Sequence, residues 1–209
     1  SHCNLKCVFC QNHEISQEYK GAEITINRLS DIFLELQNKG ANNINLVTPT
    51  HYVPQIIEAI EIAKYKGLKL PILYNTNGYD TLETIKLLDG YIDVYLPDFK
   101  YFDDKYSIKY SKAKDYSSEI IPILKEMVRQ TGKPSFDDKG RILKGVIIRH
   151  LMLPGLLFDS KKVIDKIYST FGDDVYISIM NQYTPMHNSS KYPEINKFLK
   201  IGRASCRER

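Results

Sequence analysis

Short apolar runs alternate with amphipathic stretches along most of the chain. The runs are rich in β-branched and aromatic residues and predict buried strands over residues 43–49, 71–77, 92–99, 145–153 and 175–182. Between them, apolar side chains recur every three or four positions and predict helices over residues 27–39, 53–66, 81–88, 117–130, 160–170 and 192–200. Residues 132–144 are rich in turn formers and predict a surface insertion or hairpin. Strands that alternate with helices predict an α/β fold with a parallel sheet.

Polar side chains gather where the predicted strands end. They are Thr48, Thr50, His51, Asn75, Asn77, Asp98, Lys100, Arg149, His150, Asn181 and Gln182. Parallel α/β sheets and barrels place their active sites at the carboxyl edge of the strands. We therefore expect an active site at this edge.

The most specific chemical signal is the stretch CNLKCVFC near the start, with Cys3, Cys7 and Cys10 in a C-x3-C-x2-C spacing. A cube of four irons normally takes four thiolates, so three from one loop leave one iron open to a small molecule. A zinc site completed by His13, in a non-catalytic module, is the alternative for these thiols. Another alternative is a lyase that uses Lys100 as a Schiff-base nucleophile, which requires a lowered pKa.

Both ends of the chain affect the interpretation. The sequence begins at Ser1, almost on the cysteines, and we expect its natural N-terminus to lie upstream. Residues 201–209, IGRASCRER, resemble a translated sequencing adapter, and we interpret them as a non-native tail. Residues 1–200 are then expected to form one domain. Excluding the tail removes Cys206 and leaves an odd set of clustered thiols, which indicates metal ligation in a reducing, cytoplasmic compartment.

Charge and hydropathy exclude some partners. The formal charge is +4; the tail contributes three arginines and one glutamate, a net +2, so about +2 remains for the rest. A chain this close to neutral gives no electrostatic argument for nucleic-acid binding. Apolar runs are too short to span a membrane, so no membrane partner is expected.

The cysteine stretch, with Phe9 in its aromatic position, resembles the signature of the radical S-adenosylmethionine (SAM) superfamily. The wider match is similar to the branch of the pyruvate formate-lyase activating enzyme. It runs through CNLKCVFCQNHEIS, NINLVTPTHYVPQI, LYNTNGY, YLPDFKY and IIRHLMLPG. The resemblance implies a partial (βα)6 TIM-like barrel, with the cluster loop after a first strand that this chain lacks.

The resemblance also implies cofactors and residue roles. Cys3, Cys7 and Cys10 would ligate a [4Fe–4S] cluster, whose open iron binds SAM. Reductive cleavage would yield a 5′-deoxyadenosyl radical that abstracts hydrogen. The residues implied to contact SAM, or to lie next to those contacts, are Phe9, Gln11, Asn12, Asn75, Thr76, Asp98, Lys100 and Arg149. Relatives carry a glycine-glycine-glutamate-like turn for the SAM amine where this chain has residues 46–51. The alternatives for the acceptor here are the hydroxyl of Thr48, the hydroxyl of Thr50 and the backbone carbonyls of this turn.

The implied partner is a glycyl radical enzyme, from whose backbone glycine the radical would remove a hydrogen atom. A small-molecule substrate is the alternative within the same chemistry. A low-potential electron donor such as flavodoxin or ferredoxin is also implied.

Overall fold

Five parallel strands form the sheet of the computed structural model, which describes residues 2–18 and 20–199. In spatial order they are β1 (Ile44–Val47), β2 (Ile72–Thr76), β3 (Val94–Pro97), β5 (Ile142–Leu151) and β6 (Tyr176–Met180). A short strand, β4 (Ser135–Phe136), pairs antiparallel with the start of β5 and makes the expected hairpin. The parallel α/β fold is therefore confirmed. The tail at 201–209 lies outside the described residues.

Helices connect the strands in the expected alternation. The long ones are α2 (Ile26–Asn38), α3 (Val53–Tyr65), α6 (Tyr116–Thr131) and α7 (Leu157–Phe171), and α4 (Leu82–Leu87) is short. Two further helices, α1 (His13–Gln17) and α5 (Asp104–Ser111), were not expected from periodicity. The remaining pieces are the 3-10 turns η1 (Thr50–Tyr52), η2 (Gly172–Asp174) and η3 (Ser189–Lys191).

The helix expected over residues 192–200 is wrong: residues 192–199 contain turns but no helix. The amides of Ile195 and Asn196 both donate to the carbonyl of Tyr192, which closes a single turn. Ile195 is fully buried, whereas Phe198 is 69% exposed. Ile195 is the one fully buried apolar residue of the described segment, and Tyr192 and Leu199 are only partly buried against the core. Tertiary packing of an apolar face stabilises most helices, and this segment buries no continuous face.

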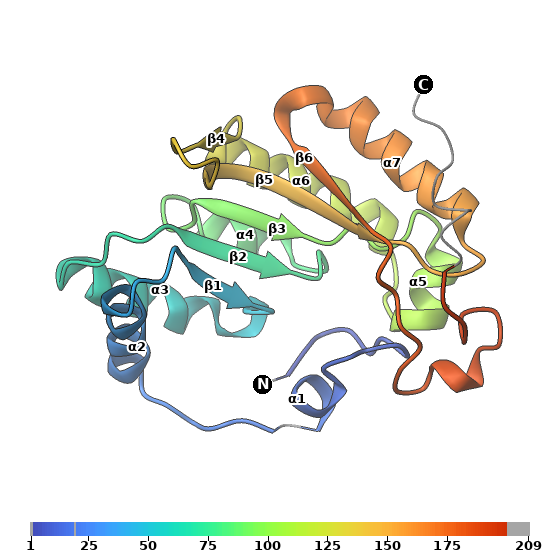
Figure 1. The fold of residues 1–209 in the computed structure, drawn as a ribbon, viewed down its shortest axis with the longest axis horizontal. Coiled ribbons are helices and arrows are strands. Elements are labelled where there is room, and N and C mark those ends of the chain that lie inside the picture. The colour runs from blue at the N-terminus through green and yellow to red at the C-terminus, as the bar shows by residue number, and fades with distance from the viewer. Residues whose placement is uncertain (1, 19, 200–209) are drawn as a thin grey trace.

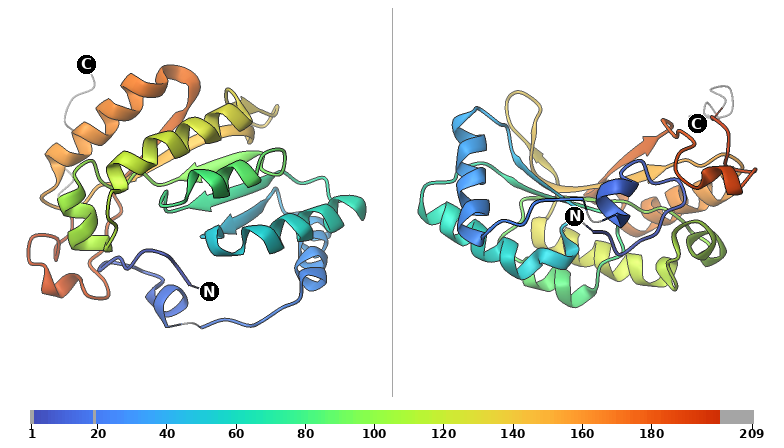
Figure 2. Two further views of the ribbon diagram at one scale, coloured as in Figure 1. Left: turned by 180° about the vertical axis from the view of Figure 1, so that it is seen from behind. Right: turned by 90° about the horizontal axis from the view of Figure 1, so that it is seen from below.

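The helices α3, α4, α6 and α7 cover one face of the twisted sheet (Figures 1 and 2). Strand residues that point to this face, including Tyr74, Tyr95, Val146 and Ile148, are fully buried. They join the core cluster with helix residues such as Ala59, Ile85, Ile120 and Val163. This packed layer holds the strands, and therefore their carboxyl ends, in place relative to one another.

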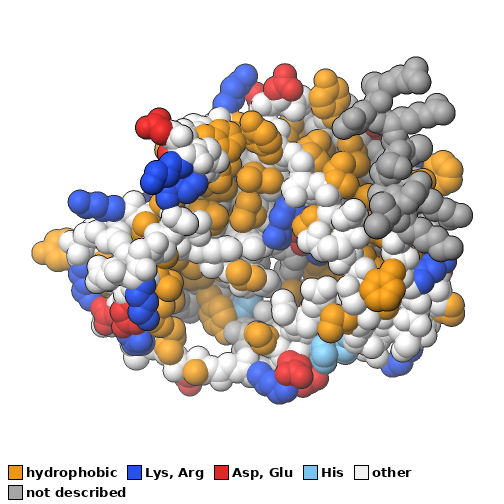
Figure 3. All heavy atoms as spheres, viewed as in Figure 1, with side chains coloured by type: hydrophobic (Ala, Val, Ile, Leu, Met, Phe, Trp, Pro, Cys, Tyr) orange, Lys and Arg blue, Asp and Glu red, His pale blue; other side chains and the backbone are white. Residues whose placement is uncertain are grey.

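The other face of the sheet is concave and faces the viewer in Figure 1, with the N-terminal segment and α1 below it. Hydrophobic side chains gather over β5 and the neighbouring strands on this face (Figure 3). The register aligns Asn75 with Leu96 and Asp98 with Arg149, so their side chains point to the same face. At the β1 edge, among the described residues, β1 has a strand neighbour on one side only, and Val47 is 63% exposed.

None of the helices within residues 2–18 and 20–199 combines the length and apolar character needed to cross a bilayer.

A buried histidine ties β3, β5 and α7 together. His150 is 2% exposed; its Nδ1 lies 2.7 Å from the Phe99 carbonyl oxygen and its Nε2 lies 2.9 Å from Ser160 Oγ. A carbonyl only accepts, so Nδ1 carries the proton and Nε2 accepts from the hydroxyl. Burial lowers the pKa of His150, an effect opposed by the Phe99 carbonyl and by Asp159 and reinforced by Lys100.

We expect this histidine to make stability depend on pH. The unfolded chain binds a proton near pH 6.5, whereas folded His150 resists it, so its contribution is fully present above pH 6.5 and is lost as pH falls. The slope approaches about 1.4 kcal/mol per pH unit. Urea unfolding at pH 7.5 and 5.5 should show a larger drop for the wild type than for His150→Phe. Equal drops would contradict the assignment.

Candidate active site

The cysteine loop is held against the end of α5 by backbone hydrogen bonds. Lys6 N–H donates to the Ser111 carbonyl at 3.0 Å, and Val8 N–H donates to the Tyr110 carbonyl at 2.8 Å. The apolar residues between the cysteines, Leu5, Val8 and Phe9, are buried in the core. Because these side chains point inward, the loop is fixed while its three thiols remain partly exposed.

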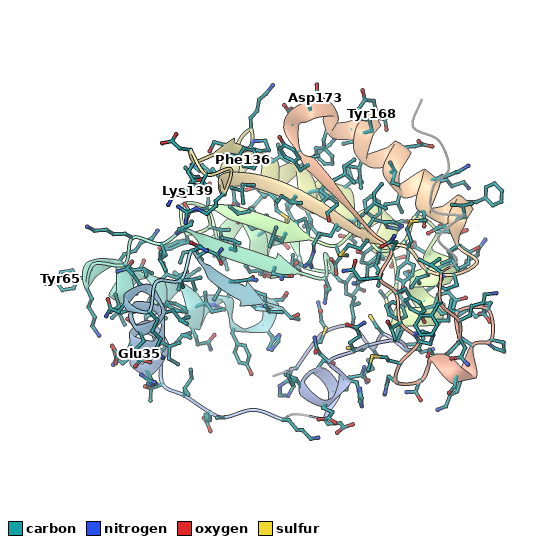
Figure 4. The ribbon with its side chains drawn as sticks, in the orientation of Figure 1. Glu35, Tyr65, Phe136, Lys139, Tyr168 and Asp173 are labelled. Atoms are coloured by element: carbon teal, nitrogen blue, oxygen red, sulfur yellow. The ribbon has the colours of Figure 1, made fainter. Side chains whose placement is uncertain are left out.

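Each thiol of the loop has a polar side-chain neighbour from a different element. Asn77 Nδ2, after β2, donates to Cys3 Sγ at 3.3 Å. Ser111 Oγ, at the end of α5, lies 3.0 Å from Cys7 Sγ. Ser16 Oγ, on α1, lies 3.4 Å from Cys10 Sγ. Figure 4 shows sulfur atoms along this loop, at the opposite end of the concave face from Phe136 on the hairpin.

Lys100, Cys3 and Cys10 all lie close enough to Cys7 to affect the ionisation of its thiol. Burial raises the pKa of the Cys7 thiol to about 11, while Lys100 and the Ser111 hydroxyl lower it, and Cys3 and Cys10 raise it further. All three cysteines are free thiols. The loop therefore supplies three sulfur donors beside an ammonium group.

Three charged side chains meet at the ends of β3 and β5. Lys100 Nζ lies 2.6 Å from Asp98 Oδ2, and Arg149 Nη2 lies 2.7 Å from Asp98 Oδ1. Arg149 Nη2 also donates to Asn75 Oδ1 at 2.7 Å, which links this group to β2. Burial disfavours the Lys100 ammonium, but Asp98 and Cys7 outweigh it, so the pKa of Lys100 is raised. The sequence predicts that Asn75, Asp98, Lys100 and Arg149 lie at one edge of the sheet, and in the structure they contact one another there.

The loop after β1 carries a strained residue. Thr48 has φ of 51°, and its N–H donates to the Asn75 carbonyl at 2.8 Å. A β-branched residue in this region costs of order 1–3 kcal/mol and usually marks a functional constraint. Thr48 lines a cavity of about 870 Å³ together with Asn12 and Ser16 of the N-terminal segment.

A buried carboxylate that the sequence analysis missed holds the same loop. Asp80 is 5% exposed and accepts from Thr50 Oγ1 at 2.7 Å, Tyr74 OH at 2.9 Å and Thr76 Oγ1 at 2.5 Å. Burial raises the pKa of Asp80, and the three hydroxyls oppose the increase. Its position shortly after a strand end was the available signal. Thr76 is 1% exposed and turned away from Asn75, so its hydroxyl is engaged by Asp80 and does not join the charged group.

The remaining predicted residues lie along the N-terminal segment. Phe9 packs edge-on against Tyr183, with ring centroids 5.7 Å apart, and is buried near Lys100. Gln11 and Asn12 are exposed, and the Asn12 carbonyl accepts from the amides of Ile15 and Ser16 at the start of α1.

The radical SAM superfamily model matches residues 1–167 of the sequence. This chain belongs to the radical SAM superfamily. The family uses a [4Fe–4S] cluster and SAM, which confirms the cofactor expectation at that level.

One sequence relative and two proteins of known structure are similar to this chain. An uncharacterized protein of Methanocaldococcus jannaschii, MJ0674, is 31% identical over 206 residues, covering 94% of this chain and 56% of the relative. SuiB of Streptococcus suis bound to SAM superposes with a TM-score of 0.65 at 16% identity, covering 97% of this chain and 43% of SuiB. SuiB has also been solved with its precursor peptide SuiA.

The FeFe-hydrogenase maturase HydG of Carboxydothermus hydrogenoformans superposes with a TM-score of 0.63 at 15% identity, covering 96% of this chain and 46% of HydG. These structures confirm the partial-barrel fold. The chain spans about half the length of the relatives it matches.

Both alternatives to radical SAM chemistry lose support from the geometry. His13 stacks on His187 with ring centroids 4.5 Å apart, and the described part of the chain holds no group of three His, Cys, Asp or Glu side chains able to bind one metal ion. The raised pKa of Lys100 is the opposite of what a Schiff-base nucleophile needs.

Tyr116, at the start of α6, is a positioning residue for the strand ends. Its hydroxyl donates to the Asp98 carbonyl at 2.7 Å, lies 3.1 Å from the Asn77 carbonyl and accepts from Lys100 N–H at 3.0 Å. Gly78 lies beside it with φ of +80°, and a Cβ there would approach the Asp98 carbonyl oxygen to 2.2 Å.

Tyr116→Phe is expected to lower the free energy of unfolding by about 1–3 kcal/mol, because it removes a fully buried hydroxyl and leaves the half-buried Lys100 amide without its acceptor. Tyr79→Phe is the matched control: its hydroxyl donates to the exposed Lys114 carbonyl at 3.0 Å, so its loss should cost less. Urea unfolding at fixed pH measures both. Equal costs would show that the Tyr116 hydroxyl does not support the strand ends.

Proposed function

We propose that this chain carries the catalytic core of an enzyme that cleaves SAM reductively and uses a 5′-deoxyadenosyl radical to remove a hydrogen atom from its substrate. The observation that carries the proposal is the meeting of three free thiols with the charged group of Lys100, Asp98 and Arg149 at one sheet edge. When bound, the cluster and SAM supply the electron and the radical, and the protein aims and shields them.

Different residues of this chain would bind the cluster and the SAM carboxylate. Cys3, Cys7 and Cys10 would hold the cluster, one thiolate to an iron. Lys100 and Arg149 offer N–H donors that suit the SAM carboxylate, and Asp98 between them keeps both cations in place.

Further roles of this chain are proposed around the cysteine loop and the cavity. Thr48, at the cavity wall, would accept from the SAM amine. Phe9, Gln11 and Asn12 would lie along the adenosyl group. The buried apolar residues of the cysteine loop would limit access of water to the cluster.

The test is anaerobic reconstitution with iron and sulfide, followed by reduction in the presence of SAM. We expect roughly four irons per chain, a brown colour, and release of methionine and 5′-deoxyadenosine. A colourless protein that binds a single zinc would overturn the proposal in favour of the zinc module.

We further propose the pyruvate formate-lyase activating enzyme-like branch, with a glycyl radical enzyme as the substrate protein. Support comes from the ordered motifs at the strand ends, which resemble that branch, and from SuiB, a relative of the same fold that binds a peptide. Mixing the reduced, SAM-loaded protein with candidate glycyl radical enzymes should yield a glycyl doublet in electron spin resonance. SAM cleavage that is stimulated only by small molecules would favour a small-molecule substrate instead.

The same proposal includes a low-potential donor such as flavodoxin or ferredoxin, and a cytoplasmic location in keeping with three reduced thiols. Reduction of the reconstituted cluster by flavodoxin, followed by SAM cleavage, tests the donor.

A further inference from the structure

Ser111, the last residue of α5, lies between a cluster ligand and a buried phenol. Its Oγ is 3.0 Å from Cys7 Sγ and 2.7 Å from the hydroxyl oxygen of Tyr101. Both Ser111 and Tyr101 are fully buried. The Ser111 carbonyl accepts from Lys6 N–H at 3.0 Å, so the same residue also anchors the cysteine loop.

Ligation of iron fixes the direction of these hydrogen bonds. A metal-bound Cys7 is a thiolate and can only accept, so Ser111 must give its single proton to the sulfur. The Tyr101 hydroxyl is then left to donate to Ser111 Oγ. The hydrogen bonds from Tyr101 to Ser111 and from Ser111 to Cys7 therefore have one consistent direction. No step of the proposed SAM cleavage requires these two hydrogen bonds.

We propose that Ser111 is a redox-tuning residue: its hydroxyl, oriented by Tyr101, donates to the Cys7 thiolate and raises the reduction potential of the cluster. This inference rests on the proposed function, because it needs a cluster on Cys7. Reduction adds one electron, and part of the added negative charge falls on the thiolate sulfurs. A donor to sulfur stabilises the reduced form more than the oxidised form, which raises the potential.

The other two thiols have weaker partners. Ser16 and Cys10 are 3.4 Å apart, and Asn77 reaches Cys3 at 3.3 Å, both longer than the Ser111 contact. Ser111 is also fully buried, so water has poor access to replace its hydroxyl if it is removed. The largest effect of a single hydroxyl on the cluster is therefore expected at Ser111.

The decisive experiment is a potentiometric titration of the reconstituted protein with dithionite. The electron spin resonance signal of the reduced cluster is measured at each potential. Ser111→Ala should lower the equilibrium constant for one-electron reduction about tenfold, which corresponds to a potential about 59 mV more negative. Ser107→Ala is the matched control. It lies in the same helix, is equally buried, and its hydroxyl donates to the Ala113 carbonyl at 2.7 Å rather than to sulfur.

Tyr101→Phe gives an independent variant that leaves Ser111 in place. It should shift the potential in the same direction by a smaller factor, because Ser111 loses the donor that orients it. An unchanged potential in Ser111→Ala overturns the inference. If Ser111→Ala assembles no cluster, the Tyr101→Phe potential decides: a lowered value supports the inference and an unchanged value overturns it. A wild-type protein that assembles no cluster refutes the proposed function first, and the inference with it.

Discussion

Replacement of Cys7 by alanine should abolish cluster assembly and SAM cleavage together. Cys7 is the middle one of the three proposed ligands, and Cys3 and Cys10 are the other free cysteines among the described residues. Two thiolates from one loop leave two irons without protein donors. We expect iron content to fall from roughly four per chain to near zero, and 5′-deoxyadenosine to fall below detection.

Cys206→Ala is the matched control for this change. It removes the one remaining cysteine of the sequence, which stands in the segment interpreted as a tail. Iron content and SAM cleavage should both be unchanged. Loss of the cluster in Cys206→Ala would mean that the protein uses four cysteines, as an electron carrier does, and that no iron is open to SAM.

Replacement of Lys100 by alanine should spare the cluster and weaken SAM binding by about 1–3 kcal/mol, or roughly 5- to 150-fold in Kd. Lys100 is half-buried beside Asp98, and its removal leaves Asp98 still paired with Arg149, so the strand ends should keep their positions. The loss is then specific to a charged donor for the SAM carboxylate. Equilibrium dialysis of reconstituted protein against SAM measures it.

Lys105→Ala is the control, because Lys105 makes an exposed ion pair with Asp103 close by in the sequence. Exposed pairs contribute little, so Kd for SAM should not change. Unaltered SAM affinity in Lys100→Ala would refute the proposed role of β3. Loss of iron in Lys100→Ala would instead assign this lysine to the cluster.

The strand framework and the charged group could be predicted from sequence for a common reason. Buried strands have apolar sequences, and parallel strands bring their ends to one edge, so the sequence alone predicts that Lys100 and Arg149 lie close together. Thr76 is a different case, because the family resemblance alone implied that it lies close to SAM. Adjacent residues of a strand point to opposite faces, and the sheet turns Thr76 toward Asp80 while Asn75 faces the charged group.

Neither helix α5 nor the contact of its Ser111 with Cys7 could be predicted from the sequence, and the reason is physical. The segment DKYSIKYS buries Ser107, Tyr110 and Ser111, while its aliphatic residue Ile108 is 46% exposed. Its packing depends on hydrogen bonds that the Ser111 and Ser107 hydroxyls make to residues just outside the helix, Tyr101 and Ala113, and such bonds leave no hydrophobic period in the sequence. The contact between Ser111 and Cys7 joins residues 104 positions apart, so only the folded chain reveals it.

The β1 edge of the sheet affects how the purified protein is expected to behave in solution. Among the described residues, β1 has no strand neighbour on its outer side, and Val47 on it is exposed; such an edge is a template for adding a strand from another molecule. We therefore expect the purified chain to self-associate in a concentration-dependent way. Light scattering across a dilution series should reveal it, and a Val47→Lys change should suppress it by placing a solvated charge where the incoming strand would dock.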